Sequence, residues 1–556
     1  MEGRRFDVTV RNGTVVTASS TVRADIGIVN GRVAAIAPAL PAGLIDHDAT
    51  GLHVLPGGVD SHCHIEQKTS TGLTPCDDFF TASIAALCGG TTTLIPFACQ
   101  HRGQSVRKVV DAYRLVAAKC ACDYAIHIIV SDPAAPGALD DLRVLFGEGY
   151  TSVKAYMTYD ALKLRDDEML ELFVLCRTHG AIVMVHAESH DLIAWITRRL
   201  LDAERTLPRY HAIARPAIAE REATHRAVTF AELIGTPLLL VHVSSAEAAA
   251  EVADARRRGL AVFGETCPQY LTLTRESLAR PHDAAKYLCS PPLRGPSDQH
   301  ALWRGLADGS LSVVSSDHSA YHFEAHDGLP MSRAAGWKPL ASKTMVDEHG
   351  NRLPFSKVPM GLPGLECRLP LLLSHGVGAG HLDLQRVAAL SATNPARLYG
   401  LHPRKGTIVV GSDADLVLWD LTAEWTVTKA ALHDSLDYTP YEGQRLQGAP
   451  VLTLIRGRVA FRRSSVRSAL NVGALDEVLA MALASDVPSL SFTADASADA
   501  SLSFTGARLR GPRRMAAVRQ ARPARMGTAR RHSLAKPRLP SPRARRRARP
   551  RDRPRD

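Results

Sequence analysis

Six side chains that can bind metal ions lie at or near the ends of short apolar runs. The runs are VDSHCH (59–64), SVKAYM (152–157), IVMVH (182–186), LLLVH (238–242) and SVVSSD (312–317). They carry His62, His64, Lys154, His186, His242 and Asp317. Imidazole and carboxylate ligands suit Zn²⁺, with Mn²⁺ and Co²⁺ as alternatives. Two such ions about 3.5–4 Å apart activate water and polarise a carbonyl group, so the pattern predicts a binuclear hydrolytic centre.

Lys154 is the most informative of the six because it lies inside an apolar strand. Burying an ammonium group without a partner is energetically costly. Burial lowers the pKa of a lysine, and the free amine can then react with carbon dioxide. The resulting carbamate is anionic, and its two oxygens can bridge two cations. We therefore expect a carbamylated Lys154; the alternative is a lysine that extends its ammonium to solvent from the strand end.

The other candidates are weaker singly than together. His62 and His64 are two residues apart on a predicted strand, so their side chains share one face. A single histidine that closes an apolar run, such as His186 or His242, is more often a hydrogen-bonded core residue. Asp317 alone could equally cap a helix. Beside four histidines, it is better interpreted as a metal ligand and proton acceptor.

The elements that must position these residues alternate between strand and helix. Eight apolar runs are separated by helical patterns. The helix predicted at 77–88 has an Asp pair suited to an N-cap and ends at Gly89-Gly90. Residues 57–400 therefore predict an α/β fold, a (β/α)8 TIM barrel. Catalytic groups of such barrels lie at the carboxyl ends of the strands, where the candidate ligands fall.

Both flanks of the barrel have the alternating pattern of β-strands. Residues 1–56 contain Asn12-Gly13 and Asn30-Gly31, each typical of a type I′ hairpin turn. Residues 401–464 have a similar pattern, with a tight turn predicted at Arg456-Gly457. We expect the two flanks to form one small β-sandwich domain.

The basic charge of the chain belongs to its C-terminal tail. Residues 465–556 are Ala/Ser-rich and then Arg/Pro/Ala-rich, a composition that predicts disorder. Residues 505–556 carry 19 basic and 2 acidic side chains, a net charge of +17, whereas the whole chain carries +11. The other 504 residues therefore carry −6. Because residues 505–556 have no interleaved aromatic residues, we do not expect them to bind nucleic acid.

Composition also restricts the cellular setting. The ten cysteines are scattered, form no CxxC pair and are typical of reduced thiols in the cytoplasm. The N-terminal sequence MEGRRFDVTV lacks the apolar core of a secretory signal. No run approaches the ~18 apolar residues of a membrane span. We therefore expect a cytoplasmic protein that does not cross a membrane.

Taken together, the motifs resemble those of the amidohydrolase superfamily, in its dihydropyrimidinase and D-hydantoinase branch. The resemblance extends from about residue 6 to 461 and rests on PGGVDSHCHIE, DDFFTASIAALCGGTTT, KAYMTYD, MVHAES, VHVSS, ETCPQYL, CSPPLR, SSDH and DYTPYEG, among others. It implies that one metal ion is held by His62, His64, Lys154 and Asp317. A second ion would be held by the Lys154 carbamate, His186 and His242.

The resemblance also implies how substrate is bound and opened. Tyr159 matches a tyrosine that donates a hydrogen bond to the developing oxyanion, and Ser290 matches a serine whose backbone binds the cyclic amide. A metal-bridging hydroxide would attack the ring carbonyl, while Asp317 takes its proton and passes it to the leaving nitrogen. Dihydropyrimidines or 5-substituted hydantoins would thus give N-carbamoyl amino acids. The resemblance further implies a homo-oligomer, with a tetramer expected.

The sequence departs from the family pattern near the expected substrate site. Met360 replaces an asparagine whose contact with substrate is largely through its backbone, so we retain Met360 as a substrate-binding candidate. Glu366-Cys367-Arg368 replaces a Glu-Asp-Arg segment. The insert at 319–358 is long, and Gln67–Gly72 lies where the family shapes its pocket. These departures bear on the choice of substrate and not on the chemistry.

Three alternative interpretations compete with this one. Dihydroorotases place an arginine two residues after the second histidine, where this chain has Glu66, which argues against an anionic ring and more weakly against allantoinase. A non-catalytic scaffolding relative would have lost metal ligands, but all six are present. An RNA-associated protein is favoured only by the composition of residues 505–556.

Overall fold

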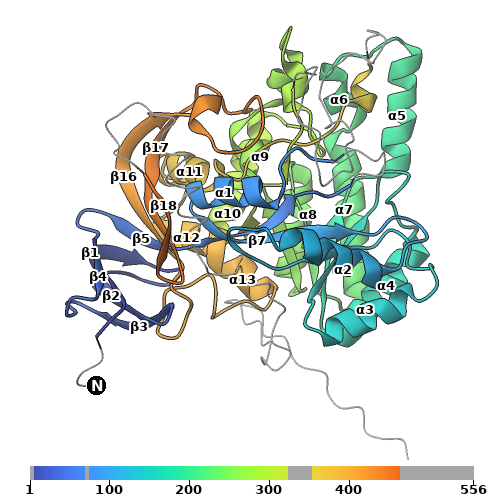
Figure 1. The fold of residues 1–556 in the computed structure, drawn as a ribbon. Coiled ribbons are helices and arrows are strands. Elements are labelled where there is room, and N and C mark those ends of the chain that lie inside the picture. Colours follow the sequence, from blue (N-terminus) through green and yellow to red (C-terminus); the bar gives the residue numbers. More distant parts are fainter. Residues whose placement is uncertain (1–4, 69–73, 324–352, 464–556) are drawn as a thin grey trace, which may run out of the picture. The chain divides into compact units, whose positions relative to one another are not determined.

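The computed structural model describes residues 5–68, 74–323 and 353–463. Most of the predicted insert, the whole predicted tail beyond residue 464 and part of the predicted pocket segment at 69–73 lie outside the described residues. All described residues belong to one unit, Met1–Leu509, which combines a barrel of parallel strands with a second sheet made from both flanks (Figure 1).

Parallel strands close the barrel. Their order is β14-β13-β12-β11-β10-β9-β7-β6-β15, and β8 pairs with β7. The strands are β6 (Gly58–His64), β7 (Thr91–Cys99), β8 (Asp123–Tyr124), β9 (His127–Ile129), β10 (Ser152–Tyr156), β11 (Ile182–His186), β12 (Leu238–Leu240), β13 (Val262–Thr266), β14 (Val313–Val314) and β15 (His318–Ser319). β14 pairs with β13 and β15 pairs with β6, so the last stretch of strand closes the ring. This confirms the predicted (β/α)8 barrel.

Helices alternate with the strands and lie around the barrel (Figure 1). They are α1 (Phe79–Cys88), α2 (Val106–Ala117), α3 (Ala138–Gly147), α4 (Asp166–His179), α5 (His190–Asp202), α6 (Arg209–Ala214), α7 (Ala217–Ile234), α8 (Ala246–Arg257), α9 (Pro268–Thr272), α10 (Pro296–Asp308), α11 (Arg368–Leu371), α12 (Leu384–Ala388) and α13 (Asn394–Leu398). α1 begins as predicted, because the Asp78 side chain accepts a hydrogen bond from the Thr81 N–H, and it ends at Gly89. In the part of the chain described, no helix combines the length and apolar character needed to span a bilayer.

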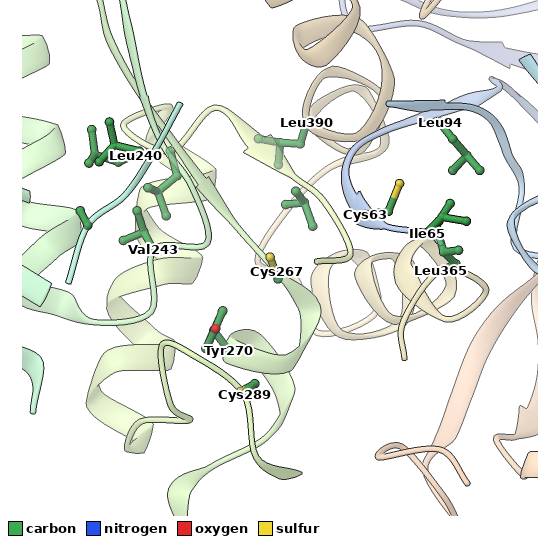
Figure 2. Packing of buried hydrophobic residues seen from close by; sticks show 14 of the residues in the cluster. Cys63, Ile65, Leu94, Leu240, Val243, Cys267, Tyr270, Cys289, Leu365 and Leu390 are labelled. Carbon is green, nitrogen blue, oxygen red and sulfur yellow. The ribbon is translucent and has the colours of Figure 1, made fainter. Parts of the chain in front are cut away.

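Successive side chains of each barrel strand point to opposite faces, and so they contribute to two separate hydrophobic cores. Val183 and Leu240 belong to the larger cluster between the strands and the helices. Figure 2 shows part of this cluster, where the labelled Leu240 lies close to Val243. Met184 and Tyr156 belong instead to a smaller cluster that also contains Leu239, Phe263 and Tyr399. Neighbouring residues of one strand thus pack into different cores, as the period of two requires.

The second sheet joins the two flanks of the barrel. Its strands are β1 (Val8–Val16), β2 (Thr21–Val29), β3 (Arg32–Ala37), β4 (Ile45–Asp48), β5 (His53–Pro56), β16 (Leu416–Thr426), β17 (Arg445–Ile455) and β18 (Arg458–Arg462). The order is β18-β17-β16-β5-β1-β2-β3, and β4 pairs with β1. β5 pairs with β16 in antiparallel fashion, so the N-terminal and C-terminal flanks form one β-structure with its own core. This confirms the predicted β-sandwich built from both flanks.

Two of the three predicted turns are confirmed. Asn30-Gly31, with φ of 50° and 73°, connects β2 to β3, and Arg456-Gly457, with φ of 47° and 73°, connects β17 to β18. Positive φ at both central residues is the signature of a type I′ turn.

The third predicted turn, at Asn12-Gly13, was wrong. Both residues lie inside β1, where the pairing with β2 shifts register between Val10 and Gly13. A Cβ atom on Gly13 would come within 2.7 Å of Val54 Cγ2. The glycine therefore permits close approach of a neighbouring strand at a bulge and does not reverse the chain.

A buried charge cluster fastens the barrel to the second sheet. Lys405 contacts Asp123 of β8, and its Nζ lies 2.6 Å from Asp415 and 3.1 Å from Asp413. Burial opposes the charge of Lys405, but the three carboxylates outweigh this effect and raise its pKa. Because Asp415 directly precedes β16, the ammonium group links strands of both sheets.

Candidate active site and metal centre

Three of the other five predicted ligands lie close to the Asp317 carboxylate. Asp317 Oδ1 lies 3.2 Å from His62 Nε2 and 3.3 Å from His64 Nε2. Lys154 Nζ lies 3.1 Å from His62 Nε2. Burial opposes ionisation of Asp317, but the neighbouring histidines and Lys154 outweigh it and lower its pKa. The carboxylate therefore stays ionised among groups that bear or can bear positive charge.

The remaining two ligands, His186 and His242, contact each other and lie close to His62. His242 Nε2 is 2.9 Å from His186 Nδ1, and the ring centroids of His242 and His62 are 5.3 Å apart. One ligand atom each from His62, His242 and Asp317 falls within 4.8 Å of the other two. The structure thus brings all six predicted ligands together, and their nitrogen and oxygen donors fit divalent ions such as Zn²⁺.

The strand alternation explains why Lys154 faces inward. Its neighbours on β10, Val153 and Ala155, pack into the outer core. Lys154 is fully buried, with Nζ 4.8 Å from the ring centroid of Phe97 and 5.2 Å from that of Tyr156. Burial lowers the pKa of Lys154 to about 8. It forms no ion pair within the described ranges, so the amine is much easier to deprotonate than an ordinary lysine.

Sequence reasoning missed the acids that orient the ligands. Glu265 Oε1 lies 2.6 Å from His62 Nδ1 and accepts a hydrogen bond from the His242 N–H at 3.2 Å. Burial raises the pKa of Glu265 to about 8. Such partners fix the ring orientation and tautomer of a metal-binding histidine. The signal was present, since an acid inside the apolar run AVFGETC requires a partner.

The other two ligand histidines have similar supports. Gln67 Oε1 lies 2.6 Å from His64 Nδ1, and Glu188 Oε2 lies 2.7 Å from His186 Nε2. Glu188 also pairs with Arg215, whose Nη1 is 2.5 Å away. Gln67 lies in the segment that the family resemblance assigns to the pocket, and it both lines the cavity and contacts a ligand histidine.

Three residues of the site have backbone conformations that side chains rarely adopt. The φ angles of Tyr159, His242 and Asp317 are 70°, 39° and 48°. Such conformations cost on the order of 1–3 kcal/mol each and persist where the surroundings fix them. In this chain they follow the carboxyl ends of barrel strands and turn three polar side chains towards one cavity.

A cavity of about 250 Å³ opens above the ligands. Its lining includes the three residues predicted to contact substrate, Tyr159, Ser290 and Met360. It also includes His64, Gln67, Lys68, Pro75, Cys99, Tyr156, Leu162, His186, His242, Asp317, Ser319, Tyr321, Pro359 and Gly361. Lys68 places a cation on the wall, which weakens the sequence argument against an anionic ring substrate.

Tyr159 and Ser290 present polar groups to this cavity from different loops. Burial raises the pKa of Tyr159, although the nearby Arg215 lowers it in part, so the phenol stays protonated at neutral pH. Ser290 Oγ is buried and has no hydrogen-bond partner among the described residues. The lining here therefore offers hydrogen-bonding groups that a ligand can satisfy.

A second group of potential ligands is a structural contact. Cys88, Glu366 and His433 lie within ligand distance of one another. Both carboxylate oxygens of Glu366 are already engaged, one 2.9 Å from His433 Nδ1 and the other accepting the His433 N–H at 2.8 Å. We interpret this cluster as a link between two loops.

Fold and site together define a (β/α)8 barrel with a metal-binding centre at the carboxyl ends of its strands. A family model described as the amidohydrolase family matches residues 53–460. The chain belongs to the amidohydrolase superfamily, in its dihydropyrimidinase and D-hydantoinase branch. Membership of this family implies a binuclear divalent metal centre.

The chain is similar to several characterised proteins over most of their length. The D-hydantoinase of Ralstonia pickettii is 39% identical over 457 residues, which cover 82% of this chain and 95% of that protein. The D-hydantoinase of Streptomyces coelicolor is 42% identical over 457 residues, covering 81% and 93%. A solved dihydropyrimidinase from Brevibacillus agri has a TM-score of 0.75 at 38% identity, covering 82% and 95%. These matches confirm the family that the sequence motifs predicted.

Proposed function

We propose that the chain hydrolyses a cyclic amide in a metal-dependent reaction. The ring of a dihydropyrimidine or a 5-substituted hydantoin would open to an N-carbamoyl amino acid. The observation that carries this proposal is the convergence of six ligand side chains beneath a cavity of about 250 Å³ that Tyr159 and Ser290 also line. The names of the similar proteins, D-hydantoinase and dihydropyrimidinase, support the same reaction class.

The donor set supports a specific assignment of the two ions, which we infer to be Zn²⁺. His62, His64, Lys154 and Asp317 would hold one ion, and carbamylated Lys154 with His186 and His242 would hold the other. The lowered pKa of Lys154, about 8, supports its reaction with carbon dioxide. When bound, two such ions supply Lewis-acid activation of water and of the ring carbonyl.

Residues of the chain itself would transfer the proton, stabilise the oxyanion and bind the ring. Asp317, kept ionised by its neighbours, would accept the proton of the attacking water and return it to the ring nitrogen as that bond breaks. The protonated hydroxyl of Tyr159 would donate a hydrogen bond to the oxygen that gains negative charge. Backbone groups near Ser290 and Met360 would hold the ring, because both residues line the cavity.

We also propose that the chain acts as a homo-oligomer, with a tetramer expected, in the cytoplasm. In α5 only Ile193 is buried, whereas Leu192 and Trp195 are 41% and 53% exposed. A second copy of the chain would cover this apolar surface. The structure has all ten cysteines in the thiol form, which is typical of a reducing compartment. Light scattering of the purified protein measures the oligomeric state directly.

The experiment that tests the reaction class is product identification. Purified protein is incubated separately with dihydrouracil, 5-phenylhydantoin, allantoin and dihydroorotate, and products are identified by mass spectrometry. We expect addition of one water to the first two substrates. Asp317→Asn should abolish the product, whereas Asp167→Asn, an exposed change in α4, should not. Preferential opening of dihydroorotate would replace this substrate class with the anionic one that Lys68 could favour.

A further inference from the structure

Arg215 lies between the proposed oxyanion donor and a proposed metal ligand. It is in the short connection between α6 and α7, and its side chain is 11% exposed. Its Nη1 is 2.5 Å from Glu188 Oε2, and its Cζ is 5.1 Å from the ring centroid of Tyr159. One guanidinium group thus pairs with a carboxylate and also lies over an aromatic ring.

The carboxylate that Arg215 contacts also contacts His186. Glu188 Oε2 lies 2.7 Å from His186 Nε2, so the same oxygen faces both partners. The side chains of Glu188 and Arg215 are 1% and 11% exposed, so this carboxylate and guanidinium pair inside the protein, where such contacts are strong and directional.

The Tyr159 ring is held by the same group of residues. Its centroid is 5.3 Å from that of His186, with the rings nearly edge to face at 64°. The Tyr159 carbonyl accepts hydrogen bonds from the backbone of Leu162 and Lys163, which fixes the turn but not the ring. The hydroxyl position follows from the side-chain torsions of Tyr159, which depend on the contacts that its ring makes with His186 and Arg215. Arg215 supplies one of them.

The backbone of Arg215 is also held in place by a hydrogen bond. Its carbonyl accepts a hydrogen bond of 2.6 Å from Arg294 Nη1. Arg294 also donates to Ser244 Oγ at 3.0 Å and to Glu220 Oε2 at 3.1 Å. Ser244 lies two residues after the ligand His242, so the loops after β11 and β12 are braced through these two arginines.

We propose that Arg215 is a positioning residue that holds the Tyr159 hydroxyl over the reacting carbonyl and ties it to His186 through Glu188. This inference rests on the proposed function, because it assigns Tyr159 to the oxyanion. A planar guanidinium can pair with a carboxylate along its edge and stack on a ring with its face, whereas a lysine ammonium cannot do both. A positive charge at residue 215 is therefore not sufficient to hold the Tyr159 ring and pair with Glu188 at the same time.

The test is Arg215→Lys, made in the wild-type chain and in the Tyr159→Phe variant. Lysine keeps a positive charge beside Glu188, so the variant avoids leaving that carboxylate unpaired. In the wild-type background we expect kcat to fall about 10- to 100-fold, with KM changed by less than about threefold. In the Tyr159→Phe background the same change should lower kcat by less than about threefold, because the positioned hydroxyl is already absent.

Controls separate this role from general support of the fold. Arg280, whose Cζ is 4.9 Å from the Tyr287 ring centroid outside the cavity, gives the matched change Arg280→Lys, which should leave kcat unaffected. Bound metal in Arg215→Lys should equal that of the wild type. An equal fall of kcat in both backgrounds, an unchanged kcat, or a rate loss that follows metal loss would overturn the proposal.

A crystal structure of Arg215→Lys provides a readout that does not depend on turnover. We expect the Tyr159 ring to leave its place beside His186 or to occupy several positions. A Tyr159 ring that stays in place would overturn the positioning role. Failure of the wild type to open any cyclic amide would contradict the proposed function instead, and the crystallographic result would still decide whether Arg215 positions the ring.

Discussion

Lys154 shows how its neighbours determine the chemistry of a side chain. In water a lysine is cationic and would repel a metal ion. Here full burial beside two aromatic rings lowers its pKa to about 8, and the candidate ligand His62 is 3.1 Å away. Conversion to a carbamate would replace a costly buried cation with an anionic bridge between two ions.

Lys154→Ala should therefore remove the metal centre. We expect bound metal, measured by mass spectrometry, and hydrolytic activity to be lost together. Acetate or propionate should restore part of the activity, because a small carboxylate can occupy the space that the side chain leaves. Lys108→Ala, on the surface of α2, is the matched control. Full activity of Lys154→Ala without added acid would contradict the carbamate.

The sequence predicted the ligands better than it predicted their partners. Each ligand ends or lies within an apolar run of the sequence, so a local pattern identified it. Glu265 supports His62 from 203 residues away, and Arg215 reaches Tyr159 only because the connection between α6 and α7 passes the cavity. Such roles depend on which elements meet in three dimensions, which no single-sequence pattern contains.

At the scale of elements, the link between the barrel and the second sheet depends on Lys405. Its ammonium group faces three buried carboxylates from two different sheets. Without Lys405, Asp123 keeps Arg456 and Asp413 keeps Arg404, but Asp415 loses the cation that compensates its buried charge. The cost should therefore be much larger than for an ion pair at the surface.

Lys405→Met should lower the free energy of unfolding by about 3–5 kcal/mol, because three carboxylates lose their shared cation. Urea unfolding monitored by circular dichroism measures the effect. Arg258→Met, which removes a half-exposed partner of Glu232 and Asp254, should cost less than about 1 kcal/mol. Equal effects of the two substitutions would refute the linking role of Lys405.

The Glu366–His433 contact gives the stability a predictable pH dependence. Burial alone would lower the pKa of His433, but Glu366 outweighs it and raises the pKa above its usual value. The protonated form is thus favoured by folding. Its stabilisation is full below the unfolded pKa of about 6.5 and is lost as the pH rises through the folded pKa.

His433→Gln should consequently destabilise the protein more at pH 6 than at pH 9, by about 1–2 kcal/mol. The comparison of wild type and variant at both pH values cancels the titration of other groups. Equal destabilisation at the two pH values would show that the contact does not depend on the proton.

The secondary-structure elements were predicted correctly where the sequence pattern repeats along the chain. A turn was predicted wrongly where a contact with a distant strand outweighed the local sequence. The period of two and the helix caps predicted the barrel, and Asn30-Gly31 predicted its turn. Asn12-Gly13 has the same local signal, yet it lies within a strand. The close approach of Val54, 2.7 Å from a Cβ on Gly13, explains the difference, and it comes from a strand that local sequence does not reveal.

In the whole molecule, the basic segment and the proposed site residues lie in different parts of the chain. The match to the amidohydrolase family covers residues 53–460, and every proposed site residue lies at or before Met360. The strong positive charge lies in residues 505–556, outside the described ranges. The composition of the tail supports no part of the proposed reaction.

A chain that ends after residue 463 should therefore keep kcat and KM within about twofold of the full chain, because its barrel, second sheet and site residues are intact. Steady-state kinetics at low and high salt provide the comparison. A tenfold loss confined to the truncated chain would instead assign the tail a role in substrate binding or assembly.

The central claim is that cyclic-amide hydrolysis depends on two metal ions held at the carboxyl ends of the strands. The most direct measurement titrates metal-free protein with Zn²⁺ in the presence of bicarbonate and follows dihydrouracil opening by the loss of its ultraviolet absorbance. We expect no turnover without metal and a rate that stops rising at two ions per chain. Turnover that persists in the metal-free protein would contradict it.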